Sequence, residues 1–306
     1  MVRNFLFHRV NPVRERLWDP MDVALFERCI KYINAHYTVV LFEDLIFSQK
    51  RYTNKKFATI MFDDGYKDNM DYARAILDRY MCKASFYVVT DCIDKNIPTW
   101  THILEHRFQH TNISELDLNF DFLPEELKIK ELSTKENRIQ YVLKLKPFLK
   151  KLSHENRSLV LDKITRAFSD IQIPKLMMTW DDLRALRNDG HYVGSHTATH
   201  LMLGTMQDES EIKYELEHAY NRIQEEMGYA PCTISYPIGS FNERVKQLSK
   251  DVGYKAGLAV KQHIFDPAKE DIFEISRIEL YNDPWWKTRL RITHTLERIK
   301  SLMRYK

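Results

Sequence analysis

The stretch TIMFDDGYKDN, residues 59–69, places two adjacent carboxylates directly after a segment that predicts a buried strand. The apolar run from Ala58 to Phe62 is typical of a strand that is buried on both faces, as in a parallel sheet. Neighbouring strand residues point to opposite faces, so Asp63 and Asp64 serve one site only if the strand breaks there, which Gly65 permits. The alternative is a strand-to-helix turn in which one Asp caps the helix that follows.

Around this stretch, short apolar runs alternate with amphipathic helical patterns. The runs that predict strands are residues 5–8, 58–62, 84–89, 192–194, 233–236, 256–260 and 273–277. The patterns that predict helices include residues 21–35, 70–80, 180–188, 210–227 and 242–252. This alternation favours an α/β fold with a mostly parallel sheet, whose closed form is a (β/α) barrel with its chemistry at the carboxyl ends of the strands.

Residues 100–178 interrupt the alternation, because they are almost entirely helical in pattern and rich in charge. Thr134 and Ser153 are expected to begin helices as N-caps. We interpret this region as a helical insertion within a single domain that spans residues 1–306. The chain has only 8 glycines and contains neither G-x-G-x-x-G nor G-x-x-x-x-G-K, so a glycine-rich phosphate cradle is not expected.

Composition excludes several classes of protein. The 46 Lys and Arg against 43 Asp and Glu give a formal net charge of +3, far from that of a general nucleic-acid binder. The four cysteines lie far apart without a C-x-x-C pair, so neither a disulfide framework nor a thiolate zinc site is expected. No window approaches the length of a transmembrane span, and the N-terminus lacks a signal-peptide pattern, which together predict a cytoplasmic protein.

The C-terminal segment has a different character. Its sequence, KTRLRITHTLERIKSLMRYK, places Leu290, Thr293, Leu296, Ile299 and Met303 on one helical face with Lys and Arg around it. We expect this face to dock on the domain, and peripheral contact with an anionic bilayer is the alternative.

A second constellation lies in GSHTATHLM, residues 194–202, directly after a predicted strand. His196 and His200 stand four residues apart, close enough to converge on one metal ion. A lone H-x-x-x-H also occurs by chance on surface helices. Combined with a carboxylate at another strand end, however, it indicates a site of two histidines and one carboxylate with open positions for water.

In this order, FDDG, SHTATH and the Y-P-x-G of SYPIGSFN resemble the polysaccharide deacetylase family, also called carbohydrate esterase family 4. The resemblance covers the chain apart from the helical insertion. It implies an irregular (β/α) barrel and the removal of acyl groups from N-acylated sugars. It further implies that Asp63 is the catalytic base and that Asp64, His196 and His200 are the metal ligands.

The third motif, SYPIGSFN at residues 235–242, directs attention to two further candidate residues, one inside it and one elsewhere in the chain. The resemblance implies that the backbone N–H near Ile238 helps to hold the oxyanion, although a plain proline turn would explain the same letters. The family usually has an Arg shortly before this proline to orient the base, and this chain has Ser235 and Tyr236 there. Arg277, in EISRIEL, is our candidate to replace it, unless it pairs on the surface with a neighbouring glutamate.

The general acid of the family is a histidine that follows a short apolar strand late in the chain. After Gly253 we find no such segment, whereas FLFHRV near the N-terminus places His8 in this context. The chain thus resembles a branch in which this strand has moved to the N-terminus, a permutation that neighbouring termini tolerate. His8 is therefore the expected acid, and a packed histidine at the end of a strand is the alternative.

The sequence thus predicts a metal-dependent carbohydrate N-deacetylase that acts on an amino sugar of a polysaccharide or of its cytoplasmic precursor. The expected cofactor is one divalent ion, zinc first, with cobalt, nickel and manganese as alternatives. Other readings are a deformylase or deacylase of a lipid- or nucleotide-linked sugar, and a carbohydrate-binding protein without catalysis. No nucleic-acid partner is expected.

Overall fold

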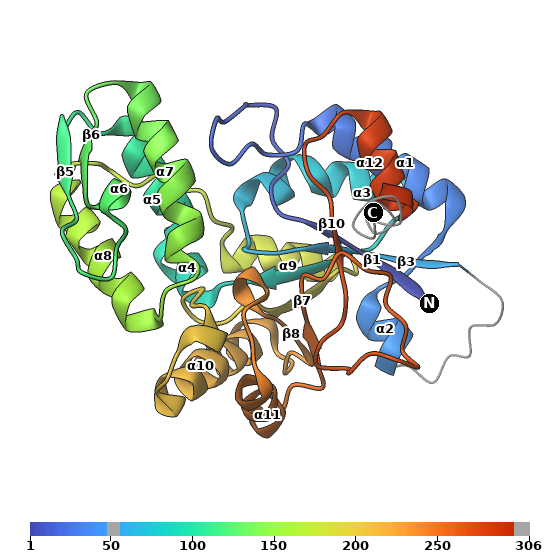
Figure 1. The fold of residues 1–306 in the computed structure, drawn as a ribbon. Helices are drawn as coiled ribbons and strands as arrows, with labels where there is room; N and C mark the ends of the chain where they lie inside the picture. Colours follow the sequence, from blue (N-terminus) through green and yellow to red (C-terminus); the bar gives the residue numbers. More distant parts are fainter. Residues whose placement is uncertain (48–55, 297–306) are drawn as a thin grey trace, which may run out of the picture.

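The computed structural model describes residues 1–47 and 56–296 (Figure 1). A curled, mostly parallel sheet forms its centre, and helices pack around it (Figure 1). Among these residues the strands of this sheet are β1 (Val2–Phe7), β2 (Thr38–Val39), β3 (Phe57–Phe62), β4 (Ser85–Val88), β7 (Tyr192–Ser195), β8 (Thr233–Ser235), β9 (Ala256–Leu258) and β10 (Ile278–Glu279). This architecture confirms the predicted α/β fold class and its irregular (β/α) barrel.

The strand order is β10-β1-β3-β4-β7-β8-β9, and β2 pairs with β3. The two outer strands form no ladder with each other; an isolated bridge joins Leu258 of β9 to Ile275, which precedes β10, so the barrel closes irregularly among the described residues. β3 is buried along its whole length, as its run of residues that are apolar apart from Thr59 predicts. Because all the strands of this sheet pair in parallel, their carboxyl ends lie at one edge.

Helices cover the outside of the sheet. Around it lie α1 (Val23–His36), α2 (Phe42–Phe47), the π-helical turn η1 (Asn69–Ala73) with α3 (Arg74–Arg79), α4 (Thr90–Lys95), α9 (Trp180–Asn188), α10 (Glu209–Met227), α11 (Glu243–Val252) and α12 (Trp285–Ile292). Their starts follow side-chain caps, since Asp22, Thr179 and Asn242 each accept bonds from the N–H groups of the first turn. The helices predicted within residues 21–35, 70–80, 180–188, 210–227 and 242–252 are therefore confirmed to within a few residues.

Residues 100–171 form a lobe beside the sheet, in green in Figure 1. It contains α5 (Trp100–His110), β5 (Glu115–Asp117), α6 (Glu125–Lys128), β6 (Ile129–Glu131), α7 (Lys135–Leu149) and α8 (His154–Ala167). Thr134 and Ser153 cap α7 and α8 as expected. The lobe has its own apolar cluster, built around Phe108, Tyr141 and Phe168, and its small antiparallel pair β5–β6 was not expected. The boundaries of the predicted insertion stay a prediction.

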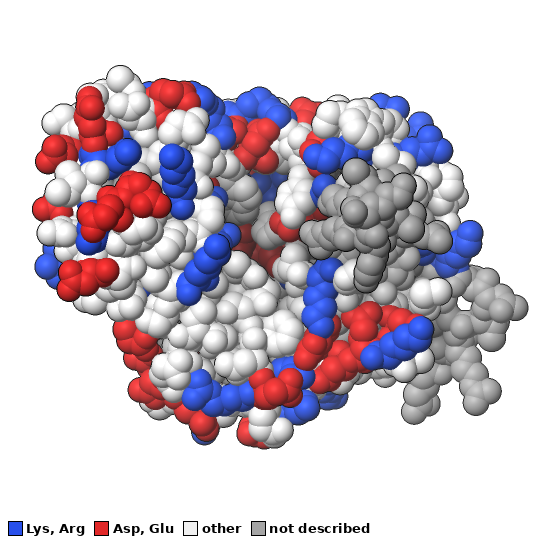
Figure 2. All heavy atoms as spheres, viewed as in Figure 1, with Lys and Arg blue, Asp and Glu red and all other residues white. Residues whose placement is uncertain are grey.

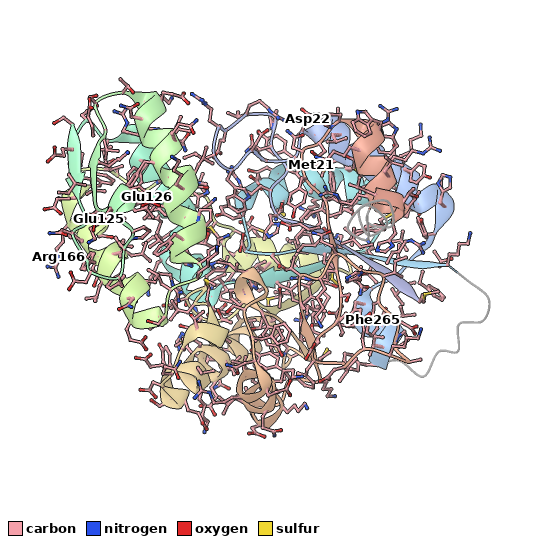
Figure 3. All side chains as sticks on the ribbon, in the orientation of Figure 1. Met21, Asp22, Glu125, Glu126, Arg166 and Phe265 are labelled. Carbon is pink, nitrogen blue, oxygen red and sulfur yellow. The ribbon has the colours of Figure 1, made fainter. Side chains whose placement is uncertain are left out.

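Side chains on the lobe divide between its apolar interior and its charged outside. Glu125, Glu126 and Arg166 are labelled on the lobe in Figure 3, at a distance from Met21 and Asp22, which precede α1, and from Phe265 near α2. The lobe and the sheet thus have separate apolar clusters.

One predicted strand is wrong. Residues 273–277 form no strand; Ile275 makes only the isolated bridge to Leu258, and the paired strand β10 starts one residue after Arg277. At the C-terminus, α12 packs on α1, with Ile292 in the core and Trp285 against Tyr32. Ile299 and Met303 of the predicted helical face lie outside the described residues.

Candidate active site

The candidate site lies at the carboxyl edge of the sheet, where consecutive strands end side by side. Phe7 of β1 pairs with Phe62 of β3, and the Asp63 N–H extends this ladder by donating to the Phe7 carbonyl at 3.1 Å. The His196 N–H likewise donates to the Val88 carbonyl at 2.9 Å. The residues that follow these ladders therefore meet at one place, as the parallel order requires.

The strand break predicted at the Asp pair is present, and Asp64 itself makes it. Its φ is 77°, a left-handed conformation that a residue with a side chain seldom adopts, and Gly65 follows at 90°. Both carboxylates are turned into the site as a result. The helix-capping alternative is wrong: Asp63 accepts hydrogen bonds from Arg277 and Ser235, and the Asp64 carboxylate faces two histidines.

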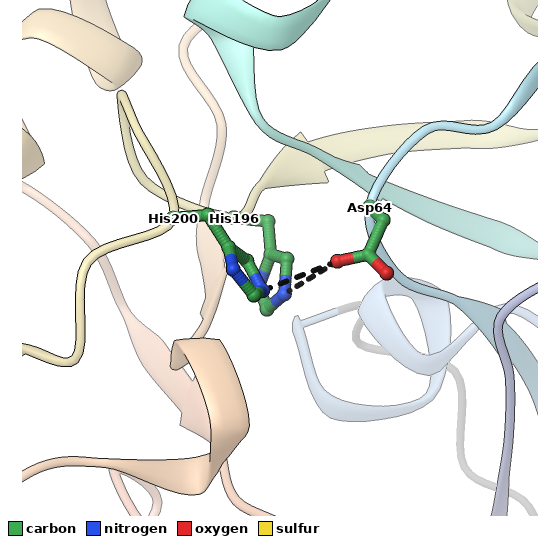
Figure 4. A group of neighbouring side chains, drawn as sticks. All are labelled: Asp64, His196 and His200. Carbon is green, nitrogen blue, oxygen red and sulfur yellow. Dashed lines mark ion pairs between the residues drawn. The ribbon is translucent and has the colours of Figure 1, made fainter. Parts of the chain in front are cut away.

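Asp64, His196 and His200 form a compact group (Figure 4). The Asp64 Oδ1 atom lies 3.4 Å from His196 Nε2 and 3.3 Å from His200 Nε2. All three side chains are buried, and Asp64 Oδ1 has no hydrogen-bond partner among the described residues. A buried oxygen without a donor, facing two imidazole nitrogens, fits a divalent cation of the zinc class, because the donor set is nitrogen and oxygen with room for further ligands.

The backbone carbonyl of Ser235, on the side of the imidazole away from Asp64, orients His196. Its Nδ1 atom lies 2.7 Å from the Ser235 carbonyl oxygen, an acceptor, so Nδ1 carries the proton and Nε2 presents a lone pair to the site. Burial lowers the pKa of His196, but the Asp63 and Asp64 carboxylates outweigh burial and the net shift is upward. Burial holds the pKa of His200 below its usual value, which favours the neutral form that binds metal.

The loop that carries the histidines is strained and anchored. Thr197 and His200 have φ values of 67° and 64°. Glu215, buried on α10, accepts hydrogen bonds from the Thr199 N–H and hydroxyl, and its own carbonyl accepts from the Ala198 N–H. The carboxylate thus stabilises a backbone conformation that is unfavourable by itself.

Arg277 reaches the site despite the missing strand. Its two terminal nitrogens donate to the two Asp63 oxygens at 2.8 Å each, and Ser235 Oγ donates to Asp63 Oδ2 at 2.9 Å. Burial raises the pKa of Asp63, but the Arg277 guanidinium outweighs it and the pKa lies below its ordinary value. The surface alternative is wrong, because Glu274 pairs with Lys246 and Lys261 instead.

The hollow above these groups is a cavity of about 180 Å³. Figure 2 shows a hollow between the lobe and the sheet, with acidic atoms at its floor and basic side chains along its rim. His8 lines the cavity at the end of β1, with its Nδ1 atom 3.5 Å from Glu279 Oε1. Ile238 also lines it, with a left-handed φ of 57° that is costly for a β-branched residue.

Sequence patterns missed several residues of this cavity. Trp18 forms part of its wall and packs edge-on against His8 at a centroid distance of 5.9 Å. Lys146 and Lys150 reach it from α7. Only Glu279 had a local signal, since it lies two residues after Arg277 and therefore on the same face of an extended segment.

A second group, Asp78, Asp189 and His191, has metal-ligating side chains, but its carboxylates are already paired with cations. Arg74 pairs with Asp189 at 2.6 Å, and Lys83 lies 3.9 Å from Asp78. We therefore assign no metal to it.

The fold is an irregular (β/α) barrel, and Asp64, His196 and His200 form a candidate cation site at the carboxyl edge of its sheet. The family model for polysaccharide deacetylases matches residues 50–257, so the chain belongs to the polysaccharide deacetylase family. The resemblance stated from FDDG, SHTATH and SYPIGSFN is confirmed, whereas the branch with a permuted first strand stays a prediction. No curated protein matches the chain.

Solved structures share the fold across almost the whole chain. The deacetylase PplD of Streptococcus pyogenes, solved with acetate, has a TM-score of 0.63 at 14% identity and covers 95% of this chain and 97% of its own. A de-N-acetylase from Aggregatibacter actinomycetemcomitans has a TM-score of 0.62 at 14% identity, with 95% and 99% covered. IcaB from Ammonifex degensii has a TM-score of 0.60 at 13% identity, with 95% and 96% covered. At these identities the likeness establishes the fold.

Two other sequence predictions concern disulfide bonds and membrane-spanning helices. The cysteines Cys29, Cys82, Cys92 and Cys232 are free, which agrees with the absence of a disulfide framework. Within residues 1–47 and 56–296, no helix combines the length and apolar character needed to cross a bilayer.

Proposed function

We propose that this protein is a metal-dependent hydrolase that removes an N-acyl group, most readily N-acetyl, from an amino sugar. The observation that carries the proposal is the buried Asp63 carboxylate, clamped by Arg277 beside the group of Asp64, His196 and His200. Membership of the polysaccharide deacetylase family supports the same reaction class.

Asp64, His196 and His200 would hold one divalent ion, for which zinc fits the ligand set best and cobalt, nickel and manganese are alternatives. When bound, such an ion lowers the pKa of a water molecule to about 7 and polarises an amide carbonyl. The protein groups around it then need to move two protons and to hold one oxygen.

Asp63 is the proposed base. Arg277 and Ser235 fix both of its oxygens, so its carboxylate keeps one orientation while it accepts the proton of the attacking water. Its lowered pKa keeps it ionised and ready to accept a proton across the neutral range.

His8 is the proposed acid. It lines the same cavity, with its Nδ1 atom 3.5 Å from Glu279 Oε1, and as an imidazolium it would donate a proton to the departing sugar amine. The backbone N–H of Ile238 is the proposed donor to the oxygen that becomes negative as water adds to the carbonyl. A cytoplasmic location remains a proposal from sequence alone.

The test is a release assay with zinc-loaded protein on a panel of N-acetylated and N-formylated sugars, free, lipid-linked and polymeric. We expect acetate or formate release from at least one of them. Asp63→Asn should keep the bound metal and lose about 10²–10⁴-fold in turnover, because an amide cannot accept the proton. Release by neither acyl class, with metal bound, would favour the non-catalytic carbohydrate-binding alternative.

A further inference from the structure

The helical lobe contributes two lysines to the cavity. Lys146 and Lys150 lie one turn apart at the end of α7 and both line the same cavity as Asp63 and His196. Long-range packing brings them there, since α7 belongs to the lobe and the other residues belong to the strand ends. The lobe therefore shapes the part of the site that faces the substrate.

The other charged groups of this cavity have partners within the protein. These pairs are Asp63 with Arg277, Glu105 with Lys146, and Glu279 with His8, whereas the Asp64 carboxylate faces His196 and His200 as a proposed metal ligand. Lys150 forms an ion pair with no carboxylate among the residues that the structure describes. Among the described residues, Lys150 is therefore the lysine of this cavity that has no carboxylate partner.

An ammonium in this position has lost much of its water without gaining a carboxylate. Burial lowers the pKa of Lys150, the charge of Lys146 acts in the same direction, and the carboxylates of Glu105, Glu279 and Asp64 offset part of the shift. A divalent ion on the three metal ligands would add further positive charge to the cavity. The natural counterion for such a group is an anion supplied by the substrate.

We propose that the amino-sugar substrate carries a phosphate ester and that Lys150 binds this phosphate. Phosphate carries more charge than a carboxylate and offers three acceptor oxygens, so it can bind Lys150 and also the Lys146 ammonium one turn away. The proposal rests on the proposed function and narrows its substrate to sugar phosphates and diphosphate-linked sugars, which share this chemistry. Neutral polymers lack the group that Lys150 recognises.

The first experiment measures binding rather than turnover. Calorimetry on zinc-loaded protein compares glucosamine with glucosamine 1-phosphate, two ligands that have no acyl group to release. We expect the phosphate form to bind at least about tenfold more tightly, since a hydrogen bond to a charged group contributes roughly 1.5–3 kcal/mol. The difference should shrink as salt is raised.

Variants separate the lysine from the metal. Lys150→Gln should abolish the preference for the phosphate form, and Lys150→Arg should retain most of it. Lys144→Gln is the matched control, because Lys144 is exposed on the same helix and lies outside this cavity. An equal preference in wild type and Lys150→Gln would mean that the phosphate binds the metal or Lys146 without Lys150, and would overturn the proposal.

Kinetic measurements on several substrates identify which kind of phosphate-bearing sugar the protein prefers. N-acetylglucosamine 1-phosphate, a nucleotide-diphosphate sugar and a lipid-diphosphate sugar are compared with a neutral oligosaccharide, and kcat/KM should be higher for at least one phosphate-bearing substrate. Acyl release that is fastest from the neutral oligosaccharide, with no effect of Lys150→Gln, would refute the inference while the proposed function stands. A phosphate preference that depends on Lys150, without any acyl release, would refute the proposed function alone.

Discussion

Replacing Arg277 by Met should destabilise the protein strongly, because it removes both hydrogen bonds from the guanidinium to the Asp63 carboxylate and leaves that carboxylate buried. The two side chains are 0% and 2% exposed, so the figure for a buried pair applies and not that for a surface pair. Breaking a buried pair by removing one partner costs about 3–5 kcal/mol, since the remaining charge stays buried without a counterion. The variant also leaves the Ala259 carbonyl without the Arg277 Nε donor, a contact of 3.0 Å.

The dependence on pH gives this prediction its sign. In the wild type the pKa of Asp63 lies below its ordinary value, so the ionised group contributes stability that is present above the unfolded pKa of about 3.9 and is lost as pH falls through the folded value. In Arg277→Met, burial acts on the carboxylate without the guanidinium and raises its pKa. The destabilisation should therefore be complete at neutral pH and should shrink as acid protonates Asp63.

The assay is urea unfolding of the metal-free protein at several pH values, with Arg277→Met compared with the double variant Arg277→Met, Asp63→Asn. The double variant should regain part of the lost stability, because neither buried charge remains. Arg16→Met is the control, since Arg16 pairs with Glu136 on the surface at 56% and 54% exposure, and its effect should be far smaller. A loss below about 1 kcal/mol for Arg277→Met at neutral pH, or no recovery in the double variant, would refute the reasoning.

Three further predictions concern the site. His8→Phe should lower kcat and flatten the alkaline limb of the pH profile of kcat/KM, because the proton donor is lost. The two histidines after Gly253 are His263 and His294, and an intact limb in His8→Phe together with its loss in His263→Ala or His294→Ala would place the acid near the C-terminus. Elemental analysis should find about one divalent ion in the wild type and none in His196→Ala, His200→Ala, and equal metal in both would disprove the ligand assignment. Glu215→Ala should weaken metal binding by about 10–100-fold through the loosened histidine loop, whereas unchanged affinity would show that the loop holds its own conformation.

Local sequence patterns predicted all but one of the proposed strands of the main sheet and the grouping of Asp64, His196 and His200, because both depend on short segments. The run before Asp63 is apolar apart from Thr59, which is typical of a strand buried on both faces, and His196 and His200 lie within one short loop. Helix starts at Asp22, Thr179 and Asn242 were equally local, since a cap bonds to N–H groups within three residues. The meeting of Asp64 with the histidines followed from the rule that parallel strands end at one edge.

Only the tertiary structure decided which distant side chains complete the site. The sequence named Arg277 as a candidate, but it lies 214 positions from Asp63, so its bidentate contact depends on where the sheet closes. Lys150 looks like any solvated lysine in a charged helix until the lobe packs over the strand ends. Local patterns record the faces of single elements, whereas charge pairing across the cavity depends on distances that exist only after these elements pack together.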